Sequence, residues 1–505
     1  MLLAVTEALG ATWGLPRFLL AMALLAFGLF CCYVKYIHIK YDYIPGPPRA
    51  SFFLGHIPIL WRILKKNEIF HEYFLQWAEE YGPIVRLNIA HRIFICVLSP
   101  EGVKEFLTSP QYPKDQHVYG AVANMFGIRV VGNGLASDCN INRWRKQRKI
   151  MDPAFSRTYL NGLEGIFNDQ AEEFMKVMEE KADGETEVDM TTLMERATID
   201  IIGKVAFGME MNTIWDKQMP FLRAMTVVMR GIGASRDLFF QYNPRNRKVV
   251  EETRKSARLL RRIGKECIEE RLRAVRNGEE TPSDILAKIL ENAGQEGQND
   301  EENMLDNFMT FFIAGYDTTA NLLSTTLMEL GRHPEILAKL QAEVDEVIGV
   351  KRDITCEDLR KLHYLSQVFK ETLRLYPPVP STIRWTGTET IIEGIRIPAN
   401  STLIFSTGAM GRMEKFFKNP LMFDPDRFRE DQPKPYFCYF PFSLGPRSCI
   451  GQTFAQEETK LLMAKFLQKF EFQLVPPQSF KLRDTGIVRL LDNVVCKVTL
   501  RNSCI

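Results

Sequence analysis

The hydrophobic and polar positions of the chain follow a helical period over much of its length. Apolar residues recur every three to four positions, with polar residues between them, in several long segments. These segments are Leu160–Met178, Val249–Asn277, Asp306–Leu330, Pro334–Val347 and Asp358–Leu375. Strand-like alternation is confined to the short segments Ile84–Leu87, Ile93–Leu98, Thr390–Ile397 and Val494–Leu500. The pattern therefore predicts a mainly α protein with a small β region, in the α+β class.

An uncharged apolar run from Phe18 to Val34 lies near the N-terminus. A helix of this length spans roughly 25 Å, close to the lower limit for crossing a bilayer. The run passes into an aromatic and basic border that includes Lys35 and Lys40, without a small-residue cleavage site, which favours a retained anchor over a cleaved signal peptide. Lys and Arg are more frequent after the run than before it, so the rest of the chain is predicted to face the cytosol. We assign residues 1–44 to this transmembrane anchor.

The remainder of the chain, residues 45–505, is predicted to be one large domain. It begins with Pro45-Gly46-Pro47-Pro48, whose prolines disfavour helix and lead the chain away from the membrane, and it contains no further linker or repeat. With 46% hydrophobic residues the chain can bury a large core, and its net charge of +2 gives no indication of a nucleic-acid partner. Its ten cysteines are scattered without metal-finger spacing, which indicates neither a disulfide framework nor a structural zinc site.

One cysteine near the C-terminus stands in a motif, Phe442-Ser443-Leu444-Gly445-Pro446-Arg447-Ser448-Cys449-Ile450-Gly451, followed by an apolar-periodic helix. A thiolate needs positive surroundings and N–H donors to stay deprotonated, and a loop that leads into a helix N-terminus supplies them. At every fixed position the segment resembles F-x-x-G-x-R-x-C-x-G, the haem signature of the cytochrome P450 family. The resemblance implies that Cys449 ligates the iron of haem b and that Phe442, Gly445, Arg447 and Gly451 help to bind the haem. The two glycines would let backbone approach the porphyrin and the sulfur.

This resemblance extends from the anchor to the end of the chain and implies the cytochrome P450 fold. It also implies a haem-thiolate monooxygenase, because an axial thiolate favours cleavage of the O–O bond. By the same resemblance, the enzyme takes its electrons from NADPH–cytochrome P450 reductase. The expected location is the endoplasmic reticulum membrane, with the catalytic domain in the cytosol. The expected partners are the reductase, membrane lipid and a lipophilic small molecule, and no nucleic acid is expected.

Ala314-Gly315-Tyr316-Asp317-Thr318-Thr319 lies within the apolar-periodic segment Asp306–Leu330. Considered alone, the segment is explained by a threonine bonded to its own helix and an aspartate in an ion pair. It also resembles the oxygen-binding groove of the family, in which Gly315 would clear space over the iron. By that resemblance Asp317 and Thr318 deliver protons to bound oxygen.

Four further segments resemble structural and haem-contacting motifs of the family. Glu371-x-x-Arg374 and Arg427, in Phe423-Asp424-Pro425-Asp426-Arg427-Phe428, resemble a buried network that supports the haem loop, although a surface ion pair would also explain the spacing. Trp144-x-x-x-Arg148 and Arg384 resemble propionate-binding positions. The basic residues around Trp144 would steer an acidic flavoprotein if that helix lies on the proximal side.

The substrate region is predicted from position in the family. Apolar segments on either side of a predicted break at Gly231 and Gly233 resemble the paired roof helices of the substrate channel, where they would also contact lipid. The residues expected to line the pocket are Tyr119, Phe126, Ala314, Val379 and Val488. A sterol is the leading substrate by resemblance, and fatty acids or xenobiotics are the alternatives. A haem-thiolate isomerase and a non-catalytic haem sensor are rivals from other classes.

Overall fold

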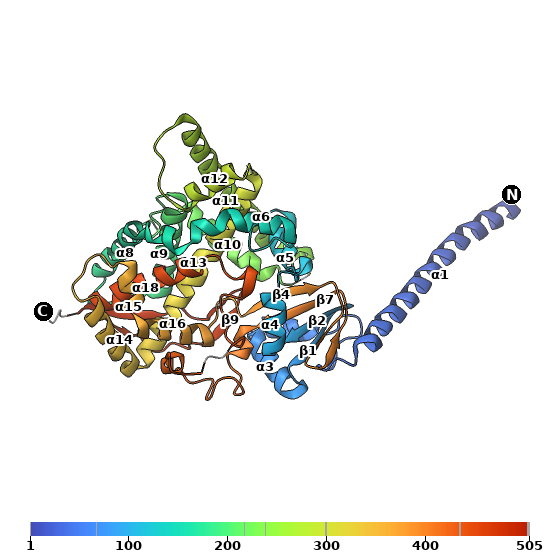
Figure 1. Ribbon diagram of the computed structural model, residues 1–505. Coiled ribbons are helices and arrows are strands. Elements are labelled where there is room, and N and C mark those ends of the chain that lie inside the picture. The colour runs from blue at the N-terminus through green and yellow to red at the C-terminus, as the bar shows by residue number, and fades with distance from the viewer. Residues whose placement is uncertain are drawn as a thin grey trace.

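A long N-terminal helix projects from the rest of the molecule (Figure 1). The computed structural model describes residues 2–501 except 67, 217, 238, 298–299 and 434–435, and for residues 2–16 it describes the backbone only. The helix is α1 (Leu2–Tyr41), and its side chains from 17 to 30 are exposed. Its segment Arg17–Tyr41 is long and apolar enough to cross a membrane, by length and composition.

The chain next builds a four-stranded sheet close to the base of α1 (Figure 1). The strand order is β1-β2-β7-β4, and only the β2–β7 pair is parallel. The strands are β1 (Ile84–Ile89), β2 (Arg92–Val97), β4 (Ser381–Thr386) and β7 (Ser401–Ser406). Three smaller sheets pair β3 (Asp183–Asp189) and β8 (Phe470–Leu474) with β11 (Val495–Leu500), β9 (Leu482–Asp484) with β10 (Val488–Leu490), and β5 (Thr390–Ile392) with β6 (Ile395–Ile397).

Helices form the larger part of the molecule, beside the four-stranded sheet (Figure 1). Those near the sheet are α2 (Ile57–Lys65), α3 (Phe70–Tyr81), α4 (Pro100–Thr108), α5 (Gln116–Ala123) and α17 (Thr407–Met410). The helical part contains α6 (Ile141–Met151), α7 (Arg157–Asn161), α8 (Glu164–Glu179), α9 (Met190–Phe207), α10 (Pro220–Ala234), α11 (Arg247–Asn277), α12 (Ile285–Gln295), α13 (Glu301–Arg332), α14 (Pro334–Val347), α15 (Cys356–Lys361), α16 (His363–Leu375) and α18 (Gln452–Lys469). The mainly α prediction with a small β region is confirmed.

The helix α13 is the axis of the helical core. It is buried on nearly all sides from Met304 to Phe312 and again from Thr319 to Leu330, where it packs against α9, α11 and α16. A helix that is buried on all sides is stable only when neighbours cover it, and here the surrounding helices do so. Between the two buried stretches some side chains face open space, and this interval positions the site described below.

Three predicted elements differ from the structure. The segment predicted as one helix from Leu160 to Met178 is divided into α7 and α8 by a turn at 162–163. The predicted helix 358–375 is likewise divided at Leu362, which leaves helical geometry with ψ of 78° and buries its side chain completely. The predicted strand 390–397 is the hairpin of β5 and β6, because Gly394 supplies a left-handed turn residue at φ +73°.

The predicted break at Gly231 and Gly233 is wrong. Both glycines lie inside α10, which continues to Ala234. They are needed for close packing rather than for a turn: a Cβ on Gly231 would meet Cγ2 of Thr253 at 2.5 Å, and one on Gly233 would meet the carbonyl oxygen of Thr485 at 2.5 Å. The helix therefore lies close against α11 and the C-terminal strands.

An ion network ties α16 to the segment that follows α17, with Glu371 and Arg374 fully buried and Arg427 partly exposed. The Glu371 carboxylate accepts two hydrogen bonds from Arg374 at 2.7 Å and one from Arg427 at 3.0 Å. Arg374 also donates to the carbonyl oxygens of Gly411 and Pro420, both at 2.6 Å. Because every charge has an opposite partner, the network joins three segments without leaving an unpaired ion in the core.

We expect Glu371→Gln to lower the free energy of unfolding by about 3–5 kcal/mol, because it leaves two arginines, one of them fully buried, without their counter-ion. Denaturant titration followed by circular dichroism measures the change. The matched control is Glu357→Gln, which removes the exposed pair of Glu357 with Lys361 and should change stability by less than about 0.5 kcal/mol. A loss below about 1 kcal/mol for Glu371→Gln would contradict the structural role.

Candidate active site

The loop that carries Cys449 is held in place by its own hydrogen bonds and by α4. The Cys449 amide donates to the carbonyl of Phe442 at 2.8 Å, closing the loop immediately before α18. Gly445 has φ of +65°, and a Cβ there would lie 2.3 Å from the carbonyl oxygen of Leu107 at the end of α4. The glycine is thus required by contact with α4, and its role beside the porphyrin stays a prediction. At Gly451 the nearest atom to an added Cβ is Cys449 Sγ, at 3.9 Å.

Cys449 is accessible, although it lies deep enough in the protein for burial to affect its pKa. A side chain that is both enclosed and accessible borders an internal open space. Enclosure raises the pKa of the Cys449 thiol, whereas the Gly451 amide hydrogen bond and the charges of Arg148 and Lys114 oppose that rise. These three groups favour the thiolate form, which is the form that binds metals.

Arg148 contacts the cysteine loop directly. Its guanidinium donates to the carbonyl of Ser448 at 2.8 Å and to the Asp152 carboxylate at 2.5 Å. Arg148, which was predicted to bind a propionate, therefore donates to two protein acceptors. One of these bonds holds Ser448, the residue before Cys449, in place. Trp144, one turn earlier on α6, packs its ring 3.8 Å from the Arg447 guanidinium, an arrangement that stabilises a cation by cation–π attraction.

Three cations lie at the edge of this region: Lys114 and Arg447, which are half-buried, and Arg384, which is buried. Burial lowers the pKa of all three groups, the charges of Arg384 and Arg447 lower that of Lys114 further, and the charge of Arg384 lowers that of Arg447, whose pKa falls to about 10. They donate to backbone carbonyls, those of Ala136, Ile383 and Asp138 respectively. Within the described part of the chain none of the three forms an ion pair. The Nη2 atoms of Arg384 and Arg447 are buried and have no hydrogen-bond partner.

Burying the Arg384 charge beside two further cations, without a paired carboxylate, is costly, so this cluster favours an anionic ligand. A haem has two propionate carboxylates, and bidentate arginines are well suited to bind them. The cluster and the accessible Cys449 together fit the predicted haem. The sequence analysis missed Lys114, because it belongs to no motif. Lys114 joins the cluster because the segment before α5 lies beside β4, where the Trp385 amide donates to the Pro113 carbonyl.

On α13 the exposed interval contains Ala314 and Thr318. Ala314 is exposed and Thr318 is half-buried, although Phe312 and Tyr316 on the same helix are buried. The Thr318 hydroxyl donates to the carbonyl of Ala314 at 2.7 Å. Gly315 faces elsewhere: a Cβ there would lie 3.2 Å from Ile202 of α9. The glycine was expected to clear space over the iron. Its missing Cβ instead allows close packing against α9, which corrects that expectation.

Asp317 forms an ion pair with Arg489 of β10 and is 2% exposed. Burial raises the pKa of its carboxyl, and the ion pair with Arg489 opposes the rise. The aspartate and Thr318 are neighbours in sequence, but only the threonine borders the open interval of α13. Arg489 was not predicted as part of the site, since a lone arginine in a short C-terminal strand carries no sequence signal.

Four of the five predicted lining residues form two groups, and the fifth, Tyr119, is half-buried. Ala314 and Val379 are exposed, whereas Phe126 and Val488 are buried. Phe126 stacks on Phe240 at 5.8 Å, and the Val488 amide donates to the carbonyl of Pro378, which fixes the segment before Val379. Tyr119 lies beside the cation cluster: its ring is 4.4 Å from Lys114 Nζ, and its hydroxyl accepts from the amide of Ile383.

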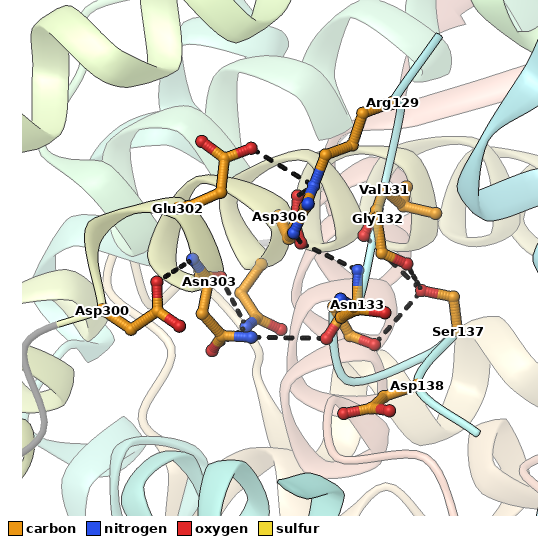
Figure 2. A network of polar contacts seen from close by, with 12 residues as sticks. Arg129, Val131, Gly132, Asn133, Ser137, Asp138, Asp300, Glu302, Asn303 and Asp306 are labelled. Atoms are coloured by element: carbon orange, nitrogen blue, oxygen red, sulfur yellow. Dashed lines mark hydrogen bonds and ion pairs between the residues drawn. The ribbon is translucent and has the colours of Figure 1, made fainter. Parts of the chain in front are cut away.

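A second polar network holds the chain that leads into the cation cluster (Figure 2). Asp306 on α13 is fully buried and accepts two hydrogen bonds from Arg129, at 2.9 and 2.6 Å, and one from the Asn133 amide at 2.8 Å. The same chain continues to Ser137, which donates to the carbonyl of Gly132 at 2.8 Å, and to Asp138, whose carbonyl accepts from Arg447. The network thus connects α13 with the position of a haem-loop arginine.

Comparison with known proteins agrees with this geometry. A family model described as cytochrome P450 matches residues 45–497. Cytochrome P450 4d2 of Drosophila melanogaster is 28% identical over 457 residues, covering 86% of this chain and 89% of the relative, and cytochrome P450 4V2 of Homo sapiens is 28% identical, covering 85% and 84%. The protein LUTEIN DEFICIENT 5, chloroplastic, of Arabidopsis thaliana is 30% identical and covers 81% and 71%.

We expect Arg384→Met to weaken haem retention, because it removes a cation that would bind a propionate. The same substitution should stabilise the haem-free chain by about 1–4 kcal/mol, because it removes a buried charge that has no counter-ion there. Transfer of haem to excess apomyoglobin, followed by absorbance, should be about tenfold faster or more than in the parent protein. Arg429→Met, which removes an exposed arginine paired with Asp431, is the control and should leave the rate unchanged. An unaltered rate in Arg384→Met would remove the basis for the propionate assignment.

Proposed function

The chain belongs to the cytochrome P450 family, whose members are haem-thiolate monooxygenases, and on this premise we propose that it hydroxylates a sterol with O2 and electrons from an NADPH-dependent reductase. The observation that carries the proposal is the combination of an accessible Cys449 with the unpaired cations Lys114, Arg384 and Arg447. Cys449 would ligate the iron, and the cations would hold the propionates. The bound haem supplies oxygen activation, because a thiolate ligand favours O–O cleavage.

The residues of α13 would act at the open interval that Ala314 and Thr318 border. Ala314 has no side chain beyond Cβ, so it would leave room for a substrate, and it accepts the Thr318 hydroxyl hydrogen bond through its carbonyl. By turning from this carbonyl, the hydroxyl would be able to donate a hydrogen bond into the open interval. Asp317, whose pKa is raised by burial, would resupply the proton.

A sterol is proposed as the substrate on sequence resemblance. Leu340–Gly349, Asp306–Gly315 and Tyr439–Gly445 resemble the corresponding segments of cholesterol 24-hydroxylase. Ala314 and Val379, the exposed pair among the predicted lining residues, are apolar and provide no cation for a carboxylate, which favours a neutral lipid. A fatty-acid or xenobiotic hydroxylase is the alternative, and the names of the relatives reported above state neither a sterol nor a fatty acid.

We also propose that α1 anchors the enzyme in the endoplasmic reticulum membrane with its catalytic domain in the cytosol. In support, Phe30 of α1 stacks on Phe53 at 6.0 Å, and Phe52 and Phe53 are both partly exposed beside the helix. Tyr33 and Tyr36, near the end of α1, are exposed as well, and tyrosine is enriched at the membrane–water boundary. The basic face of α6, with Arg145 and Lys149, is the proposed docking region for the reductase.

We expect cholesterol and related sterols to shift the spin state of the purified holoenzyme and to give a monohydroxylated product with reductase and NADPH. Absorbance titration and mass spectrometry of the products measure the two effects. Cys449→Ser should lose the thiolate spectrum and all product. Shifts with fatty acids and none with sterols would overturn the sterol assignment, and a thiolate spectrum without NADPH-dependent product from any lipid would favour an isomerase or a sensor.

We expect Thr318→Ala to lower the product formed per NADPH about tenfold or more while NADPH consumption continues, because the removed hydroxyl is the one that borders the site. Product and peroxide are quantified against NADPH consumed. Thr319→Ala is a matched control, since Thr319 makes the same 2.7 Å bond to its own helix but is buried. Equal coupling in the two variants would remove Thr318 from the proposed mechanism.

A further inference from the structure

One arginine joins two carboxyl groups behind the open interval of α13. Arg489, on β10, pairs with Asp317 through Nη2 and approaches Oε1 of Glu195 through Nη1 at 3.5 Å. The Asp317 side chain is 3% exposed and the Glu195 side chain is 27% exposed. Glu195 belongs to α9, which packs along α13. The three side chains therefore connect a buried acid of the site with the solvent-facing side of α9.

Two carboxyls that share one guanidinium favour sharing one proton. An arginine stays protonated in proteins, so it neutralises one of the two negative charges and leaves the second without compensation. Burial and the nearby Asp317 raise the pKa of Glu195 to about 7 against the opposing effect of Arg489. Burial also raises the pKa of Asp317. At neutral pH Glu195 is accordingly balanced between its protonated and charged forms.

Four further groups surround Glu195. Asp189 raises the pKa of Glu195 and Arg196 lowers it, both from α9 or its N-terminal cap. Arg483 of β9 is near enough for Glu195 to affect its pKa, and it stays cationic. On α13, burial raises the pKa of Tyr316 far above its ordinary value, so its hydroxyl stays neutral. Glu195 is the member of this cluster that exchanges protons near pH 7.

We propose that Glu195 is the surface end of the proton supply to Asp317 and that Arg489 is the positioning residue that holds the two carboxyls together. In each cycle an O–H bond of Glu195 breaks, the Asp317 carboxylate gains the proton, and solvent water reprotonates Glu195. Asp317 needs such a donor because it has almost no contact with solvent of its own. The inference deepens the proposed function, since it depends on the role of Asp317 and Thr318 in proton delivery.

The test is the pH dependence of Glu195→Gln in the holoenzyme, with Glu195→Asp and Asp317→Asn beside it. Because the donor is the protonated form, the product rate of the parent should fall as the pH rises through about 7. In Glu195→Gln the rate at pH 7 should be about tenfold lower, without this pH-dependent step, and with a larger solvent isotope effect. Glu195→Asp should restore part of the step, and Glu187→Gln, on the exposed face of β3, should behave as the parent.

A second measurement does not use turnover. The folded pKa of Glu195 lies above its unfolded value of about 4.3, so its contribution to stability is present at low pH and is lost as the pH rises to about 7. The corresponding decline in the free energy of unfolding should be absent from Glu195→Gln. A carboxylic C=O infrared band that titrates near pH 7 should be lost as well.

The outcomes separate this inference from the proposed function. If Asp317→Asn impairs product formation while Glu195→Gln keeps the rate and pH profile of the parent, the relay is wrong and the role of Asp317 stands. If Asp317→Asn has no effect, proton delivery by Asp317 fails, and the relay fails with it. If Glu195→Gln changes turnover but neither the infrared band nor the pH dependence of stability, Glu195 is structural and the relay is likewise rejected.

Discussion

Positive charge that the protein itself leaves without counter-ions is the constraint on which the active site depends. Lys114, Arg384 and Arg447 come from three separate segments, and none of them forms an ion pair with a carboxylate of the described residues. Arg384 is buried and the other two are half-buried, so a bound anion would offset the cost of bringing the three charges together. Lys114 also acts on the accessible Cys449 thiol in the direction of the thiolate.

The Glu371 network shows the opposite solution to the same problem. Glu371 and Arg374 are fully buried, but every donor of Arg374 is matched by a carboxylate or carbonyl oxygen. Such a network stabilises the scaffold and has no need of a ligand. The Asp306 network is of the same satisfied kind, and it fixes the chain whose carbonyl at Asp138 receives Arg447 (Figure 2). The Asp306 network, whose charges are paired, therefore helps to hold Arg447, which has no ion-pair partner, in place.

The C-terminal strands also take part in the chemistry of α13. Arg489 reaches Asp317 and Glu195 from β10, while the neighbouring Val488 carbonyl accepts from Asn321 of α13. These contacts explain why Asp317 faces away from the open interval that Ala314 and Thr318 border. In this site the acid and the alcohol have different surroundings, one buried and ion-paired, the other open to the ligand side.

The helical class, the apolar N-terminal helix and the motif around Cys449 could be predicted from the sequence, because these depend on local periodicity and on residues adjacent in the chain. Thr318 and Glu371–Arg374 were also evident, since their spacing is that of one helix. Tertiary structure alone decided the rest. Lys114 and Arg489 reach the site from distant segments, and Gly315 and Gly445 are set by contacts with α9 and α4. The sequence around these residues does not mark them, because their roles depend on contacts with segments that are distant in the chain.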